Sequence, residues 1–185
     1  MTHPIEREVK LRFDDPQSAR AAIVACGATP LRRRRLQADA LLDAEDESLM
    51  RRGCTLRIRT EPGASVLTFK GPRQPGTMKI REEHEAVVAD GEALRRIVEQ
   101  LGFRVCFRYE KYREEFSAPD VTIALDETPV GTFVEIEGSE PGILAVTHAL
   151  GRTSADFVLD SYHALFVQHR KACGLTGSDM VFGPA

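Results

Sequence analysis

Charged and apolar residues alternate with a period of two at the start of the chain. Between residues 5 and 13, one face of an extended strand would carry Glu6, Glu8, Lys10 and Arg12, and the other face is mostly apolar. Successive side chains of a strand point to opposite faces of its sheet. The stretch from Pro4 to Phe13 therefore predicts a strand with one packed face and one face that presents two carboxylates followed by cations.

The same alternation recurs along most of the chain. It predicts charged faces on strands at residues 55–59, 66–70, 79–88, 103–116, 121–126 and 132–137, and a further strand at 36–43. The coarse count is about eight antiparallel strands, a number that commonly closes into a barrel. The sequence thus predicts an α+β fold with an eight-stranded antiparallel β-barrel and helices packed on the outside.

About four helices are expected between these strands. The first follows Asp14 or Asp15 as its cap and has Pro16 in its first turn. The others lie at residues 90–101, 141–150 and 161–173, the last with Asp160 as its predicted cap, and residues 44–52 form a short helical turn or loop. The apolar stripes of the helices at 90–101 and 161–173 need a surface to cover.

The chain length and the absence of a linker or repeat indicate a single domain. With 185 residues the chain can bury a sizeable core. We expect residues 1–173 to form that domain and the glycine-rich residues 174–185 to be a flexible C-terminal tail.

Composition excludes several classes of function. A formal net charge of -3 argues against a nucleic-acid binder, and no stretch has the length or character of a signal or membrane span. The four cysteines of the chain are widely spaced and form no CxxC motif, which favours reduced thiols in a cytoplasmic protein. The five histidines also lack ligand spacing, so any bound metal should have oxygen ligands.

The charged strand faces leave two arrangements open. The acidic set is Glu6, Glu8, Glu83, Glu85, Asp126, Glu135 and Glu137, and the basic set is Lys10, Arg57, Arg59, Lys70, Arg81, Lys111 and Arg113. In one arrangement these residues form salt bridges on the solvent-exposed outer face of a β-sandwich. In the other they point into a barrel whose apolar outer face lies beneath helices. That many buried charges would have to be paired or matched to ligands.

A polyphosphate with a divalent metal would match such an interior. Arginine and lysine bind phosphate oxygens, and clustered carboxylates bind Mg²⁺ or Mn²⁺. No GxxxxGK[ST] motif is present, so the site would not be of the Walker type. The arginine run at residues 32–35 enters a strand-like segment, and we expect at most two of its side chains to face a site.

An ordered set of motifs resembles one known family. Glu6-x-Glu8-x-Lys10 is similar to the ExExK signature of the CYTH superfamily, the triphosphate tunnel metalloenzymes. The further matches are Leu56-Arg57-Ile58-Arg59, Thr68-Phe69-Lys70-Gly71-Pro72, Arg81-x-Glu83-x-Glu85, Glu110-Lys111-x-Arg113, Leu125-Asp126, Gly131-Thr132-Phe133-Val134-Glu135-Ile136-Glu137 and Ser161-Tyr162-x-x-Leu165. They span residue 5 to about residue 170 and look closest to the class IV adenylate cyclase-like and thiamine triphosphatase-like branch.

The resemblance implies an enzyme with a triphosphate-binding tunnel and a role for each matched residue. Phosphate binding is implied for Lys10, Arg57, Arg59, Lys70, Arg81, Lys111 and Arg113. Binding of Mg²⁺ or Mn²⁺ is implied for Glu6, Glu8, Glu83, Glu85, Asp126, Glu135 and Glu137. Glu6, Glu8 and Lys10 would be the catalytic residues.

Two enzymatic functions follow from this resemblance, and a third hypothesis is of another class. The first is hydrolysis of a triphosphate such as ATP, tripolyphosphate or thiamine triphosphate. The second is a class IV adenylate cyclase, a lyase that converts ATP to cyclic AMP and pyrophosphate. The third is a non-catalytic polyphosphate-binding module. We expect no nucleic-acid or membrane partner, and a monomer or homodimer.

Overall fold

Eight strands and five α-helices make up most of residues 5–183, the part of the chain described by this computed structural model. In chain order they are β1 (Ile5–Phe13), α1 (Pro16–Ala25), β2 (Thr29–Ala44), α2 (Ser48–Arg51), β3 (Thr55–Glu61), β4 (Ala64–Lys70), β5 (Lys79–Val88), α3 (Gly91–Gln100), β6 (Phe103–Ala118), β7 (Val121–Thr128), β8 (Gly131–Gly138), α4 (Glu140–Ala149), the 3-10 turn η1 (Ser154–Asp156) and α5 (Tyr162–Cys173). Pro4, at the start of the predicted first strand, lies outside the described residues.

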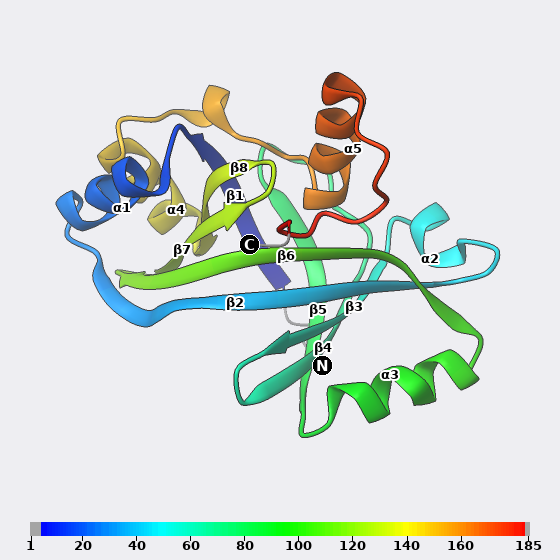
Figure 1. The fold of residues 1–185 in the computed structure, drawn as a ribbon. Helices are drawn as coiled ribbons and strands as arrows, with labels where there is room; N and C mark the ends of the chain where they lie inside the picture. Colours follow the sequence, from blue (N-terminus) through cyan, green and yellow to red (C-terminus); the bar gives the residue numbers. More distant parts are fainter. Residues whose placement is uncertain (1–4, 184–185) are drawn as a thin grey trace.

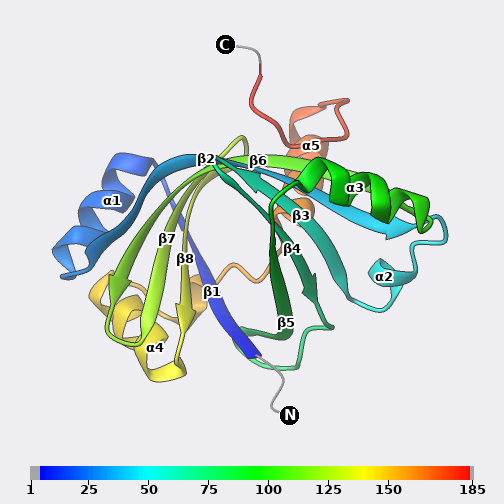
Figure 2. The same ribbon diagram turned by 90° about the horizontal axis from the view of Figure 1, so that it is seen from below.

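The strands form one closed antiparallel barrel in the order β1-β5-β4-β3-β2-β6-β7-β8 (Figures 1 and 2). Its longest members are β2 and β6, which have 16 residues each and pair along most of their length. The predicted eight-stranded barrel is confirmed. However, β2 begins at Thr29 and so includes the arginine run, because the twisted β6 offers it a partner as far as Ser117.

Apolar side chains of the barrel point outward and are covered by helices. Val9 and Leu11 of β1 are fully buried and pack in one cluster with Ile23 of α1 and Ile143 of α4. Both helices lie together on one side of the barrel, over β1, β7 and β8 (Figure 2). Hydrophobic burial therefore takes place outside the barrel, and the wet-faced sandwich is excluded.

Helix α3 covers the opposite side, across β3, β4 and β6 (Figure 2). Val98 of this helix packs against Leu42 of β2 and Ile58 of β3 in a second apolar cluster. Its N-terminus is capped by Asp90, whose side chain accepts a hydrogen bond from the Ala93 backbone N–H.

Local hydrogen bonds confirm one predicted cap, correct another and define the short helix α2. Asp15 caps α1, while Ser161 rather than Asp160 caps α5, because the serine hydroxyl accepts from the Ala164 N–H. The Asp43 carboxylate accepts from the backbone N–H groups of Leu49 and Met50 and so holds the first turn of α2.

The C-terminal segment packs against β6 through residue 182, in contrast to the flexible tail expected from residue 174. Met180 is fully buried, and backbone hydrogen bonds link it in both directions to β6, at Arg108 and Glu110. The Phe182 ring lies 5.2 Å from that of Tyr112. Apolar burial and strand-like pairing thus fix this segment, while residues 184–185 lie outside the described part, as do residues 1–4 of the predicted domain.

No helix within residues 5–183 has the length and apolar character needed to cross a membrane.

Candidate active site

A cavity of about 720 Å³ runs through the interior of the barrel. Its walls come from seven of the eight strands, together with the N-terminus of α5 and the α2 region. Every residue that the sequence assigns to the site lines this cavity except Asp126, which lies behind its wall and is fully buried. Alternation along the strands therefore brings the predicted residues together in one place.

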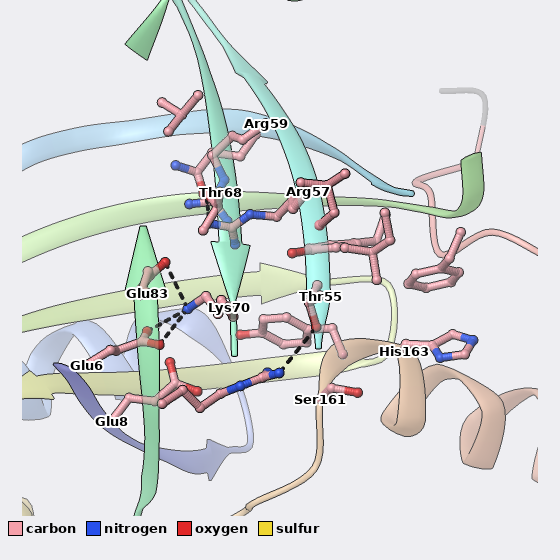
Figure 3. A pocket seen from close by; sticks show the side chains of 18 of the residues that line it. Glu6, Glu8, Thr55, Arg57, Arg59, Thr68, Lys70, Glu83, Ser161 and His163 are labelled. Atoms are coloured by element: carbon pink, nitrogen blue, oxygen red, sulfur yellow. Dashed lines mark hydrogen bonds and ion pairs between the residues drawn. The ribbon is translucent and has the colours of Figure 1, made fainter. Parts of the chain in front are cut away.

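Three carboxylates gather on one wall. Glu6, Glu83 and Glu137 each offer an oxygen, and these oxygens lie within 4.8 Å of one another. Lys70 lies among them: its Nζ is 2.6 and 2.7 Å from the Glu6 oxygens and 3.2 Å from Glu83 (Figure 3). Burial, with the nearby Glu8 and Glu83 carboxylates, raises the pKa of Glu6 to about 8 despite this lysine.

This carboxylate trio, Glu6, Glu83 and Glu137, fits a divalent cation. Mg²⁺ and Mn²⁺ prefer oxygen ligands, and carboxylates held close together gain when a dication replaces protons and a single ammonium group between them. Burial also raises the pKa of Glu137, as expected where like charges converge. The other predicted metal ligands, Glu8, Glu85, Asp126 and Glu135, lie outside this trio and pair with cations or a hydroxyl group.

Glu8 lies beside two lysines. Its carboxylate is 3.0 Å from Lys79 Nζ, and Lys79 and Lys10 both donate to the Asp160 backbone carbonyl, at 3.1 and 3.0 Å. Burial and Glu135 would raise the pKa of Glu8, but Lys79 and the neighbouring lysines outweigh them and lower it. Glu8 is therefore held ionised in a basic setting, unlike Glu6.

A dense ion-pair network surrounds Asp126. Its oxygens accept from Lys111 Nζ at 2.8 Å, from Arg113 at 2.6 Å and from the Tyr162 hydroxyl at 2.7 Å. Arg113 also pairs with Glu135. Burial, with Arg113 nearby, lowers the pKa of Lys111 to about 8. The network fixes two cations at the wall of the cavity.

Arg57 and Arg59 share a buried counter-ion that the sequence did not single out. Asp39 of β2 has a fully buried side chain and lies 2.9 Å from Arg59 Nε and 3.5 Å from Arg57 Nε. Arg57 also donates to the Thr68 hydroxyl at 3.0 Å, and that hydroxyl donates to Glu85 at 2.8 Å. Glu85 is half-exposed and stands apart from the carboxylate trio.

Arg81 lines the cavity, but its guanidinium is hydrogen-bonded to the two loops that contain Gly53 and Gly71. Its guanidinium donates to the backbone carbonyls of Gly71 at 2.7 Å and Gly53 at 2.6 Å. These carbonyls occupy the donors that would otherwise face a phosphate, and the role of Arg81 in phosphate binding stays a prediction.

The arginine run contributes two residues to the far end of the cavity. Arg32 and Arg35 line it, whereas Arg34 pairs on the outer face with Glu127 at 2.6 Å. This agrees with the expectation that at most two arginines face the site. They share a side although they are three residues apart, because the β2–β6 register shifts between them.

Arg32 and Arg35 belong to an ion-pair cluster that fills this end. Glu61 accepts from Arg32 and Arg35 at 2.7 Å each and from Gln37 at 3.0 Å, while Glu115 lies 3.0 Å from Arg35. Burial would raise the pKa of Glu61, but these hydrogen bonds lower it to about 2. We call this group, Arg32, Arg35, Gln37, Glu61 and Glu115, the charged end of the cavity.

Sequence reasoning missed three further residues: Lys79 and Tyr162, which line the cavity, and Asp39, the buried partner of Arg57 and Arg59. Lys79 stands on the same period-two face as Arg81 and Glu83, a signal that could have found it. Asp39 alternates with Gln37 and Leu41 in the predicted strand at 36–43, which offers a weaker signal. For Tyr162 no periodicity places the ring over the cavity, where its centroid lies 3.9 Å from Lys10 Nζ.

Known proteins share this sequence and architecture. The CYTH domain family matches residues 4–152. A candidate adenylate cyclase of Methanocaldococcus jannaschii, MJ0240, is 31% identical over 136 residues, which cover 73% of this chain and 77% of the relative.

Solved structures share the fold. A candidate adenylate cyclase from Vibrio parahaemolyticus has a TM-score of 0.78 at 18% identity, covering 90% of this chain and 99% of its own. HpAC1 from Hippeastrum, described as a candidate adenylyl cyclase that reveals a dominant triphosphatase activity, has a TM-score of 0.62 at 20% identity, covering 89% of this chain and 96% of its own.

Proposed function

Because this chain belongs to the CYTH domain family, we propose that it is a metal-dependent enzyme that hydrolyses a triphosphate bound inside its barrel. One observation carries the proposal. A carboxylate trio that fits a divalent cation shares a single cavity with cations from six strands, β1 to β6. An anionic, metal-binding substrate with several phosphoryl groups satisfies both halves of that cavity at once.

The basic residues would hold the phosphates. Arg57, Arg59 and Arg113 are anchored by buried carboxylates, so their remaining donors are fixed in direction. Lys70, Lys10 and Lys111 would add point charges. Each of them forms an ion pair with a carboxylate, and a bound substrate could replace that carboxylate.

A divalent cation held by Glu6, Glu83 and Glu137 would neutralise phosphate charge and orient the reacting group. The protein's own contribution is then to orient the attacking water and to stabilise the charge that develops on the leaving oxygen. Glu8 is ionised and adjoins the trio, so we assign it to the water. Lys10, buried under the Tyr162 ring, is assigned to the leaving oxygen.

Adenylate cyclase chemistry is the second candidate. It is favoured by the name of the Methanocaldococcus jannaschii relative at 31% identity. The two reactions use the same phosphate-binding groups and differ in the nucleophile: water in hydrolysis, the ribose 3′-hydroxyl of ATP in cyclisation. A pure binding module would need the cations alone, so the carboxylate trio argues against it.

Product analysis separates these functions. The protein would be incubated with ATP and, separately, with tripolyphosphate, each with Mg²⁺, Mn²⁺ or a chelator. We expect orthophosphate with ADP or pyrophosphate, and no product with the chelator. Cyclic AMP with pyrophosphate would establish the cyclase instead. If tripolyphosphate binds without metal and no product forms, the protein is a non-catalytic binding module.

The remaining expectations belong to the same proposal. Mg²⁺ or Mn²⁺ is the cation, the protein works in the cytoplasm as a monomer or homodimer, and it has no nucleic-acid or membrane partner. Four free cysteines agree with a reducing compartment. Residues 1–173 are proposed as the CYTH domain.

A further inference from the structure

One edge of β6 is left without a strand partner beside the active site. On that edge β7 pairs with β6 only from Tyr112 to Ala118, whereas β2 covers the other edge along most of its length. Residues 103–111 of β6 therefore extend beyond β7, and among them Phe107, Tyr109 and Lys111 line the cavity. A sheet edge in that position needs other partners for its backbone N–H and C=O groups.

The C-terminal segment pairs with part of this edge. Figure 1 shows it, in red, returning from α5 to β6. The Met180 N–H donates to the Arg108 carbonyl at 2.9 Å, and the Met180 carbonyl accepts from the Glu110 N–H at 2.8 Å. Asp179 Oδ1 accepts from the Arg108 N–H at 2.9 Å, and a Glu110 carboxylate oxygen accepts from the Phe182 N–H at 3.1 Å. We call residues 179–182 the strap. The family match ends at residue 152, so membership of the CYTH family assigns the strap no role.

One side chain of the strap reaches the wall of the active site. Met180 is fully buried and packs in one apolar cluster with Tyr109 and Tyr162, two residues that line the cavity. The rings of these two tyrosines lie 5.9 Å apart. The next residue of the strap, Val181, is 43% exposed. Met180 therefore supports the cavity wall from outside the barrel, while its neighbour faces solvent.

Tyr109 connects this support to Arg57. A side-chain hydrogen bond joins the two residues, and burial together with the Asp39 carboxylate raises the pKa of Tyr109. The phenol is therefore neutral, and its oxygen can accept from the guanidinium. Within the part of the chain that the structure describes, Arg57 Nε is buried without a hydrogen-bond partner, and Asp39 lies 3.5 Å from it. The direction of this guanidinium therefore depends on the hydroxyl groups of Tyr109 and of Thr68, the latter at 3.0 Å.

We propose that the strap is a positioning element of the active site, in which Met180 fixes the Tyr109 ring and Tyr109 in turn directs the Arg57 guanidinium toward a bound phosphate. This inference rests on the proposed function, because it takes Arg57 as a phosphate ligand. A strap with a purely structural role would hold the chain end on β6 and leave phosphate binding unchanged. The two roles therefore differ in what the loss of the Met180 side chain does to KM.

The test measures kcat and KM for tripolyphosphate and for ATP, on the full chain with Mn²⁺. Met180→Ala removes the support beneath Tyr109, and we expect KM to rise about tenfold, the loss of one charged hydrogen bond to phosphate. Destabilisation by itself reduces the number of folded molecules, so it lowers the apparent kcat without changing KM. Met180→Leu nearly conserves the side-chain volume and should return KM to the wild-type value.

Two further variants bracket this result. Asp179→Ala loosens the strap without opening a cavity in the core, because it removes only the partly exposed carboxylate that accepts from the Arg108 N–H. It should raise KM about two- to threefold, the effect of one neutral hydrogen bond, and it replaces Met180→Ala in the test if that variant does not fold. Val181→Ala, at the exposed neighbour of Met180, is the matched control and should change neither kcat nor KM.

A double-mutant cycle tests the route through Tyr109. Tyr109→Phe keeps the ring and deletes the hydroxyl that bonds to Arg57, so it should also raise KM about tenfold. Because both changes act on the same guanidinium, Met180→Ala/Tyr109→Phe should raise KM no further than the larger single effect. Independent effects would multiply to about 100-fold in KM.

Two results overturn the inference and leave the proposed function standing. One is a KM that stays at the wild-type value in every folded strap variant, and the other is a pair of effects that multiply in the double variant. If the wild type neither binds nor turns over tripolyphosphate or ATP in the presence of metal, the proposed function itself fails and the inference falls with it.

Discussion

Lys70 Nζ lies between the two oxygens of Glu6, at 2.6 and 2.7 Å, in the middle of the carboxylates that fit a divalent cation. One ammonium group therefore occupies the position in which a dication would be most stable. A bound cation has to displace it, and the freed lysine can then reach phosphate oxygens on the substrate.

The variant Lys70→Met tests this exchange. We expect it to bind Mn²⁺ more tightly than the wild type, because no ammonium competes for the carboxylates. It should bind tripolyphosphate about tenfold more weakly, the loss expected for one charged hydrogen bond. Isothermal titration calorimetry measures both affinities.

Lys171→Met is the control, because Lys171 is exposed in the last turn of α5. It should change neither affinity. If Lys70→Met weakens Mn²⁺ binding to the same degree as tripolyphosphate binding, Lys70 supports the metal site and does not compete with it.

Glu8→Gln is expected to abolish turnover and leave the fold intact. The change removes the charge that faces Lys79 and the trio but keeps the side chain's shape and its ability to accept a hydrogen bond. Loss of a group that acts in the transition state costs about 100-fold or more in kcat. Steady-state kinetics and circular dichroism check the two parts.

The matched control for Glu8→Gln is Glu114→Gln on β6. Glu114 pairs with Arg20 of α1 outside the cavity, at 3.1 Å, so its loss should leave kcat unchanged. Full activity of Glu8→Gln would show that the carboxylate assignment is wrong.

Sequence alone could predict the barrel because odd and even positions of a strand point to opposite faces of the sheet. Val9 and Lys10 are adjacent, and a period of two sends one under the helices and the other into the cavity, where both are almost fully buried. The same rule puts Glu83 and Glu137 on cavity-facing positions like Glu6, and the structure shows that the three are neighbours. The alternation within a single strand is therefore enough to predict which of its side chains point into the cavity.

Pairing within the cavity depends on register and on loops, which this alternation does not fix. Asp126 is not part of the carboxylate trio and is paired with Arg113, its cross-strand partner. Arg81 is committed to Gly53 and Gly71, whose positions follow from loop geometry. The contact of Tyr162 with Asp126 requires α5 to pack over the barrel, and no alternation in the helix predicts which residue it presents.

That tyrosine links α5 to the ion-pair network, and Tyr162→Phe tests the link. The change deletes the hydroxyl that donates to Asp126 at 2.7 Å and leaves a buried carboxylate short of one donor. We expect the free energy of unfolding to fall by about 1–3 kcal/mol, the cost of an unsatisfied buried acceptor. Urea denaturation followed by far-UV circular dichroism provides the measurement.

For comparison, Tyr112→Phe alters a tyrosine on the outer face of β6 that packs against Arg34 and Phe182. Its effect should stay within about 0.5 kcal/mol, as for most surface changes. Equal losses in the two variants would mean that the Tyr162 hydroxyl has no special part in holding α5.

The charged end should make stability depend on pH through Glu61. Its pKa of about 2 in the folded state lies below the ordinary value of 4.5, because Gln37, Arg32 and Arg35 donate to it. The unfolded chain therefore takes up the proton first as pH falls. The stabilisation is fully present above pH 4.5 and is lost progressively between pH 4.5 and 2.

Urea denaturation of the wild type and Glu61→Gln at pH 6 and pH 3 isolates this contribution. Glutamine keeps the shape but cannot titrate, so the variant should lose less stability than the wild type over that interval, by about 1–2 kcal/mol. Identical losses would show that other carboxylates carry the acid sensitivity. Because the Glu61 side chain is only 6% exposed, 0.5 M salt should screen the difference only weakly, whereas a surface ion pair would lose most of it.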